Sequence, residues 1–285
     1  MTRRVALLGK PLRRRHSVVM HNAAFAAAGI DGEYVLAEID EPEVPDAVDR
    51  ARRPDFLGLG VTAPYKQVVA GLVDEVEGGA RTIGAVNNVV RRDDSTLLGF
   101  NTDAPGFAAA VERAMGRPIE GVDVVVAGAG GAAHAVVFAL LSGGAGRVVI
   151  GNRTRASADA LAERFAALGG GRIEAVELGS TGFGDALARA DLAVNATTVG
   201  MVDPGATIDV ERLPPHATVF DLVYVPPETP LLAAAKARGL RAANGSEMLI
   251  AQAALAFERW TGIGGMSDVM RTAVGPLLAD AAAVA

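Results

Sequence analysis

Short apolar runs alternate with segments of helical periodicity along most of this chain. In the first hundred residues the apolar runs cover residues 5–8, 33–37 and 56–61, and helical patterns cover residues 18–28 and 66–72. Short apolar runs bounded by glycine, proline or polar residues are typical of strands. Strands that alternate with helices predict parallel βαβ units, so we expect an α/β fold here.

A second alternation of strands and helices begins near Val122 and ends in a helical tail. The predicted strands are residues 124–127, 147–151, 192–195 and 218–222. The predicted helices are residues 131–141, 156–167, 230–238, 247–260 and 266–283. At 285 residues the chain is long enough for two domains, and this second set predicts a separate α/β half.

Composition excludes several classes of function. Half of the residues are hydrophobic and the net charge is −6, so there is no basic excess to neutralise the phosphates of a nucleic acid. The chain has no cysteine, which removes disulfides, thiolate metal ligands and cysteine nucleophiles and fits a reducing cytoplasm. The four histidines show no metal-ligand spacing, so we expect no metal site.

One uncharged stretch resembles a membrane span. Residues 124–146 contain no Asp, Glu, Lys or Arg, which is long enough to cross a bilayer. However, glycines interrupt it, with β-branched residues before them and helix formers after them, so a strand, a tight turn and a helix explain it better. The N-terminus has too few apolar residues before Lys10 for a signal segment. We expect a cytoplasmic protein without membrane partners.

The glycine cluster after residue 127 is a candidate nucleotide site. Residues 128–133 fit the pattern G-x-G-x-x-[G/A] between a predicted strand and a predicted helix. The first glycine permits the turn, the second lets the backbone approach a pyrophosphate, and the helix N-terminus offers N–H groups to the anion. The alternative is a purely structural turn in a chain with 34 glycines, but the strand–turn–helix context favours the nucleotide site.

The residues after the next strand indicate which nucleotide binds. An NAD site usually has an acid there for the ribose hydroxyls, but no Asp or Glu lies between Asp123 and Asp159. The segment instead reads Asn152-Arg153-Thr154-Arg155, and guanidinium groups there suit the 2′-phosphate of NADP. A solvated loop that caps the next helix is the alternative.

Lysine usage draws attention to Lys66. Only three of the 27 basic residues are lysine, namely Lys10, Lys66 and Lys236, and the lysine amine titrates where the arginine guanidinium stays charged. Lys66 follows the predicted strand 56–61, where α/β proteins place functional loops. A lysine in the first turn of an exposed helix is the alternative interpretation.

Two further polar segments have both structural and functional interpretations. Thr102 or Asp103 is a natural N-cap for a helix that begins near Pro105, and capping does not exclude a catalytic role for Asp103. The pair Asn87-Asn88 fits a binding site as well as a polar turn between two strands.

Taken together, these motifs resemble the shikimate dehydrogenase family (shikimate and quinate dehydrogenases). The motifs that carry the resemblance in the first half are Gly9-Lys-Pro-Leu with Ser17 and His21-Asn22, Val61-Thr-Ala-Pro-Tyr-Lys66, Gly84-Ala-Val-Asn87 and Asn101-Thr-Asp103. Those in the second half are Gly128-Ala-Gly-Gly-Ala132, Asn152-Arg-Thr154, Asn195-Ala-Thr197, Asp221-Leu-Val-Tyr224 and Gly245-Ser-Glu-Met-Leu with Gln252. They cover nearly the whole chain, in order and at matching spacing.

The resemblance implies a fold and an activity. We expect two α/β domains: an N-terminal substrate-binding and catalytic domain of residues 1–103 with 245–285, and a Rossmann-type NADP-binding domain of residues 104–244. The C-terminal helices return to the first domain. The implied activity is the reversible reduction of 3-dehydroshikimate to shikimate by NADPH, a step of aromatic amino acid and chorismate biosynthesis.

The resemblance also implies residue roles. Lys66 and Asp103 form the acid/base pair. The implied substrate contacts are Ser17, Thr62, Asn87, Tyr224 and Gln252, to which we add Arg15 for the reason given below. The implied cofactor contacts are Gly128, Ala129, Gly130, Gly131, Ala132, Asn152, Arg153, Thr154, Arg155, Ser157, Leu222 and Gly245.

The chemistry is consistent with these residue types. Oxidation of a secondary alcohol sends a hydride to the nicotinamide and a proton to a base near the hydroxyl. A lysine with its ordinary pKa of about 10.4 is a poor base at neutral pH. Desolvation lowers a lysine pKa and a neighbouring carboxylate raises it, so the sequence leaves open whether Lys66 or Asp103 transfers the proton.

The chain departs from the family pattern at the acid-binding motif. The family usually has two serines that hold the substrate carboxylate, and here Arg15 replaces the first while Ser17 remains. The usual asparagine two positions before Thr62 is Gly60, and Asn88 stands where threonine is common. We expect the Arg15 side chain to fill space opened at Gly60 and to clamp the carboxylate with two N–H···O bonds. The alternative is that Arg15 turns outward with Arg13 and Arg14.

These departures leave the ring substituents of the substrate open. The expected partner is a small cyclohexene or cyclohexane carboxylate, with quinate and an amino-substituted shikimate as alternatives to shikimate. A non-catalytic NADP-binding sensor is the alternative from another class, and Lys66, Asp103 and Gln252 argue against it. The sequence does not decide between a monomer and a homodimer.

Overall fold

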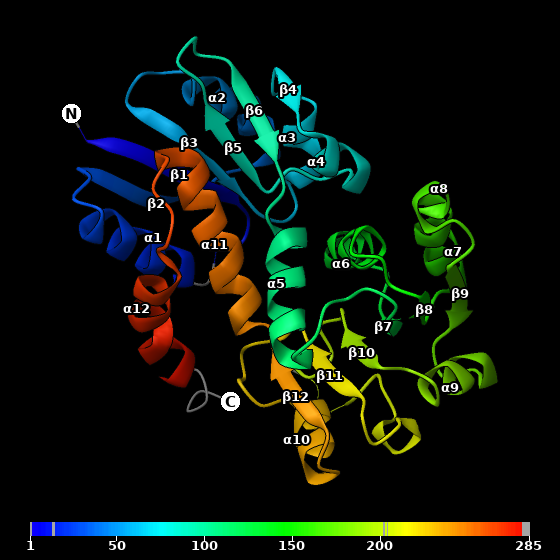
Figure 1. The fold of residues 1–285 in the computed structure, drawn as a ribbon. Coiled ribbons are helices and arrows are strands. Elements are labelled where there is room, and N and C mark those ends of the chain that lie inside the picture. Colours follow the sequence, from blue (N-terminus) through cyan, green and yellow to red (C-terminus); the bar gives the residue numbers. More distant parts are fainter. Residues whose placement is uncertain (1, 13–14, 202, 204, 281–285) are drawn as a thin grey trace. The chain divides into compact units, whose positions relative to one another are not determined.

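The contacts in a computed structural model divide the chain into two compact units. The structure describes residues 2–12, 15–201, 203 and 205–280. Unit 1 comprises residues Met1–Thr102 and Ile250–Leu277, and unit 2 comprises Asp103–Leu249 with the C-terminal residues from Leu278. The C-terminal helices thus pack in the first unit, as expected, and each unit is built on a six-stranded sheet (Figure 1).

The sheet of unit 1 is mixed, with the strand order β2-β1-β3-β5-β6-β4. Its strands are β1 (Arg3–Gly9), β2 (Gly32–Glu38), β3 (Phe56–Val61), β4 (Glu75–Val76), β5 (Asn88–Arg91) and β6 (Leu97–Phe100). β2, β1 and β3 are parallel, as the alternation of strands and helices predicted. β5 is antiparallel to β3 and β6, outside the predicted parallel βαβ units. The short turn at residues 92–96 leaves no room for a crossover, so the two strands that it joins must be antiparallel.

The helices that accompany this sheet are α1 (His16–Ala27), α2 (Val44–Arg50), α3 (Lys66–Ala70), α4 (Gly78–Ile83), α11 (Ser246–Thr261) and α12 (Ser267–Asp280). Residues 281–283 of the predicted last helix lie outside the described residues. Where α1 and α11 meet the sheet, the ring of Phe25 packs edge-on against Phe257 at 5.1 Å. Trp260 donates its indole N–H to the carbonyl of Val89 on β5 at 2.9 Å. This contact ties α11 to the sheet.

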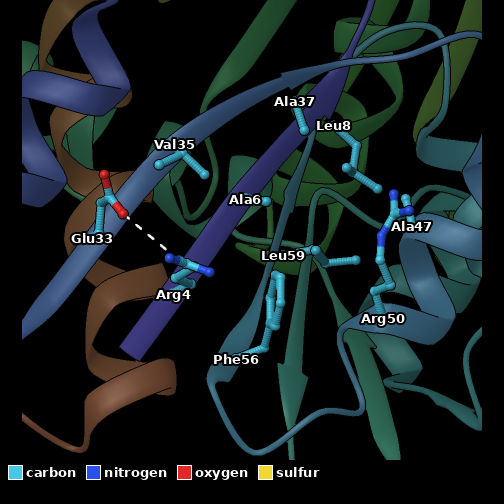
Figure 2. A pocket seen from close by; sticks show the side chains of 10 residues that line it. All are labelled: Arg4, Ala6, Leu8, Glu33, Val35, Ala37, Ala47, Arg50, Phe56 and Leu59. Carbon is cyan, nitrogen blue, oxygen red and sulfur yellow. Dashed lines mark ion pairs between the residues drawn. The ribbon is translucent and has the colours of Figure 1, made fainter. Parts of the chain in front are cut away.

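The sheet also bounds a pocket together with α2. Ten residues of β1, β2, β3 and α2 line this pocket, which has a volume of about 370 Å³, and most of them are apolar (Figure 2). At one end Arg4 forms an ion pair with Glu33 across 3.7 Å, and both side chains are half exposed. None of the ten lining residues is a predicted site residue.

Unit 2 has a parallel sheet in the order β9-β8-β7-β10-β11-β12. Its strands are β7 (Asp123–Ala127), β8 (Arg147–Asn152), β9 (Ile173–Glu177), β10 (Leu192–Asn195), β11 (Thr218–Asp221) and β12 (Arg241–Asn244). Numbered within the unit, this is the order 3-2-1-4-5-6 of a Rossmann fold, which confirms the predicted fold class. The near-continuous apolar sequence of β7 follows from burial on both faces of a parallel sheet.

The helices of unit 2 are α5 (Asp103–Met115), α6 (Gly131–Ser142), α7 (Arg155–Arg164), α8 (Ala166–Gly169), α9 (Thr181–Leu187) and α10 (Pro230–Ala237). α9 and α10 pack on alternate strand residues such as Val125, Val149 and Val219 to form one core. The sequence analysis missed β9, α9 and β12. β12 has no apolar run and is defined by its register with β11, from Thr218 opposite Arg241 to Asp221 opposite Asn244.

Within the part of the chain that the structure describes, no helix is both long and apolar enough to cross a bilayer. The uncharged stretch 124–146 instead contains β7, a glycine turn and α6, as predicted.

Candidate functional site

The glycine turn of unit 2 lies where the strand order reverses. β7 lies between β8 and β10, so the chain leaves β7 to one side and returns to the other. Ligands of open α/β sheets bind at the carboxyl ends of strands at such a point. Gly128 has φ = +111°, and a Cβ on it would lie 2.8 Å from the Thr197 methyl carbon, so only glycine fits there.

The next residues of the turn face open space. A Cβ on Gly130 or Gly131 would meet nothing within 4 Å, and α6 begins at Gly131. The N-terminus of α6 therefore has open space beside Gly130 and Gly131, where an anion can approach the backbone. This geometry fits the pyrophosphate of a dinucleotide.

The end of β8 carries the two candidate 2′-phosphate ligands. Both arginine side chains are exposed, but Arg155 donates its Nε–H to Asp159 at 2.8 Å. Arg153 forms no ion pair with any residue that the structure describes. Asn152 donates to the Thr154 carbonyl at 3.0 Å, which closes the loop between them. Arg153 therefore has the less engaged guanidinium of the two.

A buried carboxylate organises the loops after β10 and β11. Asp221 is fully buried and accepts hydrogen bonds from the Asn195 amide at 2.8 Å, the Val223 N–H at 3.0 Å and the Thr229 hydroxyl at 2.7 Å. Burial raises the pKa of Asp221, and these three donors oppose that shift. The network ties β10 to the loop that carries Leu222 and Tyr224. Asp221 belongs to a motif that is visible in the sequence, but its structural role is not.

Two predicted cofactor residues are in contact beside this loop. A Cβ on Gly245 would lie 2.2 Å from the carbonyl oxygen of Leu222, so Gly245 permits this close backbone approach. The turn after β12 is closed by Asn244, which accepts hydrogen bonds from the Ser246 N–H and hydroxyl.

The predicted substrate residues of unit 1 gather at one edge of its sheet. β1 lies between β2 and β3, so the strand order also reverses there. Thr62 directly follows β3, and α1 with Arg15 and Ser17 at its start follows β1. A Cβ on Gly9 would lie 2.4 Å from the Thr62 methyl carbon, so Gly9 lets the ends of β1 and β3 approach each other.

Lys66 also lies at this edge of the sheet. It is the first residue of α3, it is half-buried, and its carbonyl accepts the Val86 N–H at 2.9 Å. Lys10 and Lys236 form half-exposed ion pairs with Asp40 and Glu228, each at 2.6 Å. Surface ion pairs explain those two exposed lysines, whereas Lys66 is half-buried at the start of α3.

Asn87 belongs to a buried polar cluster at the same edge. It precedes β5, whose first residue Asn88 pairs with Gly60 on one side and with Phe100 on the other. The side chains of Asn87, Asn88 and Thr102 are hydrogen-bonded to one another, and the Thr102 hydroxyl also contacts Gln252. The structure thus brings Asn87 and Gln252 together through Thr102, which sequence reasoning had considered only as a helix cap.

Asp103 and Tyr224 belong to unit 2, and both are half-buried. Asp103 is the first residue of α5, so the helix begins two residues before the predicted start near Pro105. Thr102 does not cap it, because within the described chain its hydroxyl bonds to Asn87, Asn88 and Gln252 instead. The predicted substrate residues are thus distributed over both units.

The expected pairing of Arg15 with Gly60 is wrong. A Cβ on Gly60 would lie 2.5 Å from the hydroxyl oxygen of Tyr34, so Tyr34 fills the space that the missing side chain leaves. Arg15 is exposed immediately before α1. Arg13 and Arg14, its partners in the alternative basic patch, lie outside the described residues.

Comparison with known proteins identifies the family. Residues 7–89 match the family model for the shikimate dehydrogenase substrate binding domain, residues 110–202 match shikimate/quinate 5-dehydrogenase, and residues 245–274 match the shikimate 5'-dehydrogenase C-terminal domain. A shikimate dehydrogenase (NADP(+)) of Carboxydothermus hydrogenoformans is 40% identical over 96% of this chain and 97% of its own length. The chain belongs to the shikimate dehydrogenase family.

Solved structures of shikimate dehydrogenase family members have the same fold. The shikimate 5-dehydrogenase of Thermus thermophilus in complex with NADP(H) and shikimate is 38% identical, with a TM-score of 0.82 over 95% of this chain and 99% of that one. A quinate dehydrogenase from Corynebacterium glutamicum in complex with NAD is 34% identical, with a TM-score of 0.88 over 96% and 99%.

Among the described residues, no group of three or more His, Asp or Glu side chains is placed to hold a metal ion.

Proposed function

We propose that this chain is an NADP-dependent dehydrogenase that reversibly reduces 3-dehydroshikimate to shikimate. The observation that carries the proposal is the 40% identity to an NADP-dependent shikimate dehydrogenase across 96% of the chain, which includes both strand-order reversals and their predicted ligands. Unit 1 is the substrate-binding unit in this proposal, and unit 2 binds the cofactor.

Unit 2 fits the cofactor at three points. The turn at Gly128 and the open N-terminus of α6 suit the pyrophosphate. Arg153 is the ligand that suits a 2′-phosphate, since a guanidinium binds phosphate in a bidentate manner. Leu222 and Gly245, which are in contact with each other, would line the cofactor. When bound, NADP supplies the hydride donor or acceptor.

The residues of unit 1 supply binding and proton transfer. Asn87 and Gln252 bind ring hydroxyls, and Thr62 and Ser17 contact the substrate beside them. In the reduction direction Lys66 donates a proton to the substrate oxygen, and in the oxidation direction its amine takes the proton back. Asp103 orients the substrate hydroxyl. Tyr224 also contacts the substrate.

Arg15 is the candidate for a positively charged partner of the substrate carboxylate. It lies immediately before α1 at the same sheet edge as Thr62 and is exposed to solvent. A guanidinium can hold a carboxylate through two parallel hydrogen bonds, which a serine hydroxyl cannot do. Arg15 and Ser17 together therefore replace the usual pair of serines.

A turnover assay tests the function directly. We expect oxidation of shikimate with NADP⁺, with kcat/KM at least about tenfold higher than for quinate, for an amino-substituted shikimate, or for NAD⁺ as cofactor. Greater activity on quinate or on the amino compound would overturn the assigned substrate. NADP binding, observed by fluorescence, without turnover of any of the three acids would overturn the enzyme assignment.

A further inference from the structure

We propose that Thr102 and Asn88 are positioning residues that fix the orientation of the Asn87 amide, so that Asn87 presents an N–H donor to the ring hydroxyl of the substrate. The proposal deepens the function proposed above and rests on it. The evidence is a chain of hydrogen bonds in which each bond fixes the orientation of the next side chain.

The chain starts at a backbone group. The Thr102 N–H lies 2.9 Å from the side-chain oxygen of Asn87. A backbone N–H only donates, so the atom that faces it must be the amide oxygen, and this determines which way the Asn87 amide points. Asn87 is itself held on both sides, because its carbonyl accepts the Val61 N–H at 2.8 Å and its N–H donates to the Phe100 carbonyl at 3.1 Å.

Asn88 follows from Asn87. Its side-chain nitrogen lies 2.8 Å from the Asn87 amide oxygen and 2.9 Å from the Thr102 hydroxyl oxygen. Because the Asn87 oxygen only accepts, Asn88 must direct its NH₂ group at both atoms. The Asn87 oxygen then receives two donors, from Thr102 and from Asn88.

The Thr102 hydroxyl transmits this polarity to Gln252. Its oxygen accepts the Asn88 amide at 2.9 Å and the Asn87 amide at 3.2 Å, which occupies both of its lone pairs. The hydroxyl proton is then directed to the side-chain oxygen of Gln252 at 3.4 Å. The oxygen of the Asn87 amide is thus engaged twice within the cluster and one of its N–H groups donates to Thr102, so the second N–H group is the one that addresses a ligand.

Burial prevents water from relaxing this arrangement. Asn87, Asn88 and Thr102 are 5%, 4% and 3% exposed, so a reversed amide would leave a buried donor facing a donor. A substrate oxygen that meets Asn87 must therefore accept a hydrogen bond there. A ketone or hydroxyl oxygen satisfies that requirement, whereas an ammonium group has no lone pair and does not.

Three variants of the full chain test this chain of hydrogen bonds, which we call the polarity relay. Asn88→Asp keeps the side-chain shape and replaces the NH₂ donor with an acceptor, and Thr102→Val removes the hydroxyl. We expect each to raise the KM for shikimate about tenfold or more while the KM for NADP⁺ stays within about twofold. Thr102→Ser restores the hydroxyl and should bring the KM for shikimate back to within about threefold of the parent. Thr218→Val, at a buried threonine on the first residue of β11, is the matched control and should change neither constant.

A second measurement needs no variant. Shikimate analogues with each ring hydroxyl in turn replaced by fluorine or by an amine are assayed as inhibitors of the unmodified protein. At the ring position that meets Asn87, the protonated amine should bind at least about tenfold more weakly than the fluoro compound, because fluorine can accept and ammonium cannot.

The outcomes separate the two proposals. If the unmodified protein does not oxidise shikimate, the proposed function fails and this inference fails with it. Shikimate oxidation with an unchanged KM for shikimate in Asn88→Asp would overturn the polarity relay alone. The same follows if the amino analogues bind as well as the fluoro analogues at every ring position. Failure of Thr102→Val to fold leaves the decision to Asn88→Asp and to the analogues.

Discussion

The hydroxyl of Tyr34 occupies the space beside Gly60 that the Cβ of any other residue would fill, since such a Cβ would lie 2.5 Å from the hydroxyl oxygen. The Tyr34 ring is buried and stacks on His21 with centroids 4.4 Å apart. Two residues earlier on the same strand, a Cβ on Gly58 would lie 1.9 Å from the carbonyl oxygen of Val89 and 2.9 Å from the indole nitrogen of Trp260. Because alternate residues of β3 face the same side, Gly60 leaves room there for the Tyr34 ring and Gly58 for the hydrogen bond from Trp260 to Val89.

The first prediction concerns this pair. Gly60→Ala should lower the free energy of unfolding by about 1–3 kcal/mol, because the stacked Tyr34 ring cannot move away from the new methyl group. In a Tyr34→Phe background the hydroxyl is absent, and the loss should be smaller by about 0.5 kcal/mol or more. Urea denaturation of the four proteins measures the coupling. Additive losses would contradict the close contact.

Lys66 should control catalysis rather than folding. We expect Lys66→Ala to lower kcat for shikimate oxidation by about 10² or more, as the loss of a general acid/base does, with NADP⁺ affinity nearly unchanged. Lys236→Ala is the control, because Lys236 forms an exposed ion pair with Glu228 and should leave kcat unaffected. A Lys66→Ala protein with kcat within about threefold of the parent would remove Lys66 from the mechanism.

Arg153 should carry more of the preference for NADP than Arg155. A charge-assisted hydrogen bond contributes roughly 1.5–3 kcal/mol, so Arg153→Ala should lower the ratio of kcat/KM for NADP⁺ to that for NAD⁺ by about ten- to a hundredfold. Arg155→Ala should have a smaller effect, because Arg155 is paired with Asp159. The reverse order of effects would assign the 2′-phosphate to Arg155.

Arg15 should act on substrate affinity. Arg15→Ser, which restores the residue usual in the family, should raise the KM for shikimate by about tenfold or more with a smaller change in kcat. Arg50→Ser on α2, at the rim of the separate pocket in Figure 2, is the control for removal of one exposed charge. Equal KM values for the Arg15→Ser protein and its parent would rule out the carboxylate clamp.

His21 should make the folded state sensitive to acid. Burial lowers the pKa of His21 to about 3, whereas the unfolded chain binds that proton with a pKa of about 6.5. Between these values the unfolded state holds the extra proton, so stability is fully present above pH 6.5 and falls as the pH decreases, by up to about 1.4 kcal/mol per pH unit.

His21→Phe keeps a ring against Tyr34 and removes the titrating group, so it should flatten this part of the pH dependence. Urea denaturation between pH 4 and 7 measures the slope. His216→Gln is the control, because His216 is exposed beside Asp191. Identical slopes for the parent and His21→Phe would show that His21 is not the cause.

The sequence alone was sufficient to recognise the local elements with strong patterns. β7, the glycine turn and α6 were predictable because an apolar run, a G-x-G pattern and helix formers follow one another within residues 124–142. The same holds for Lys66 at the start of the helix after β3, since a strand end and a lysine are both visible in the sequence. The order of these motifs indicated the family, and with it the activity.

Only the tertiary structure decided how distant polar residues are used. Strand β12 has no apolar run and exists because it pairs with β11, and β5 is antiparallel because a short turn joins it to β6. The sequence suggested that Thr102 caps a helix, but its hydroxyl is hydrogen-bonded to Asn87, Asn88 and Gln252. Gln252 lies far from the other two in the sequence. The space beside Gly60 belongs to Tyr34 from another strand and not to Arg15. Hydrogen-bond polarity and the filling of space depend on which atoms meet across the fold, and no local pattern of residues specifies that.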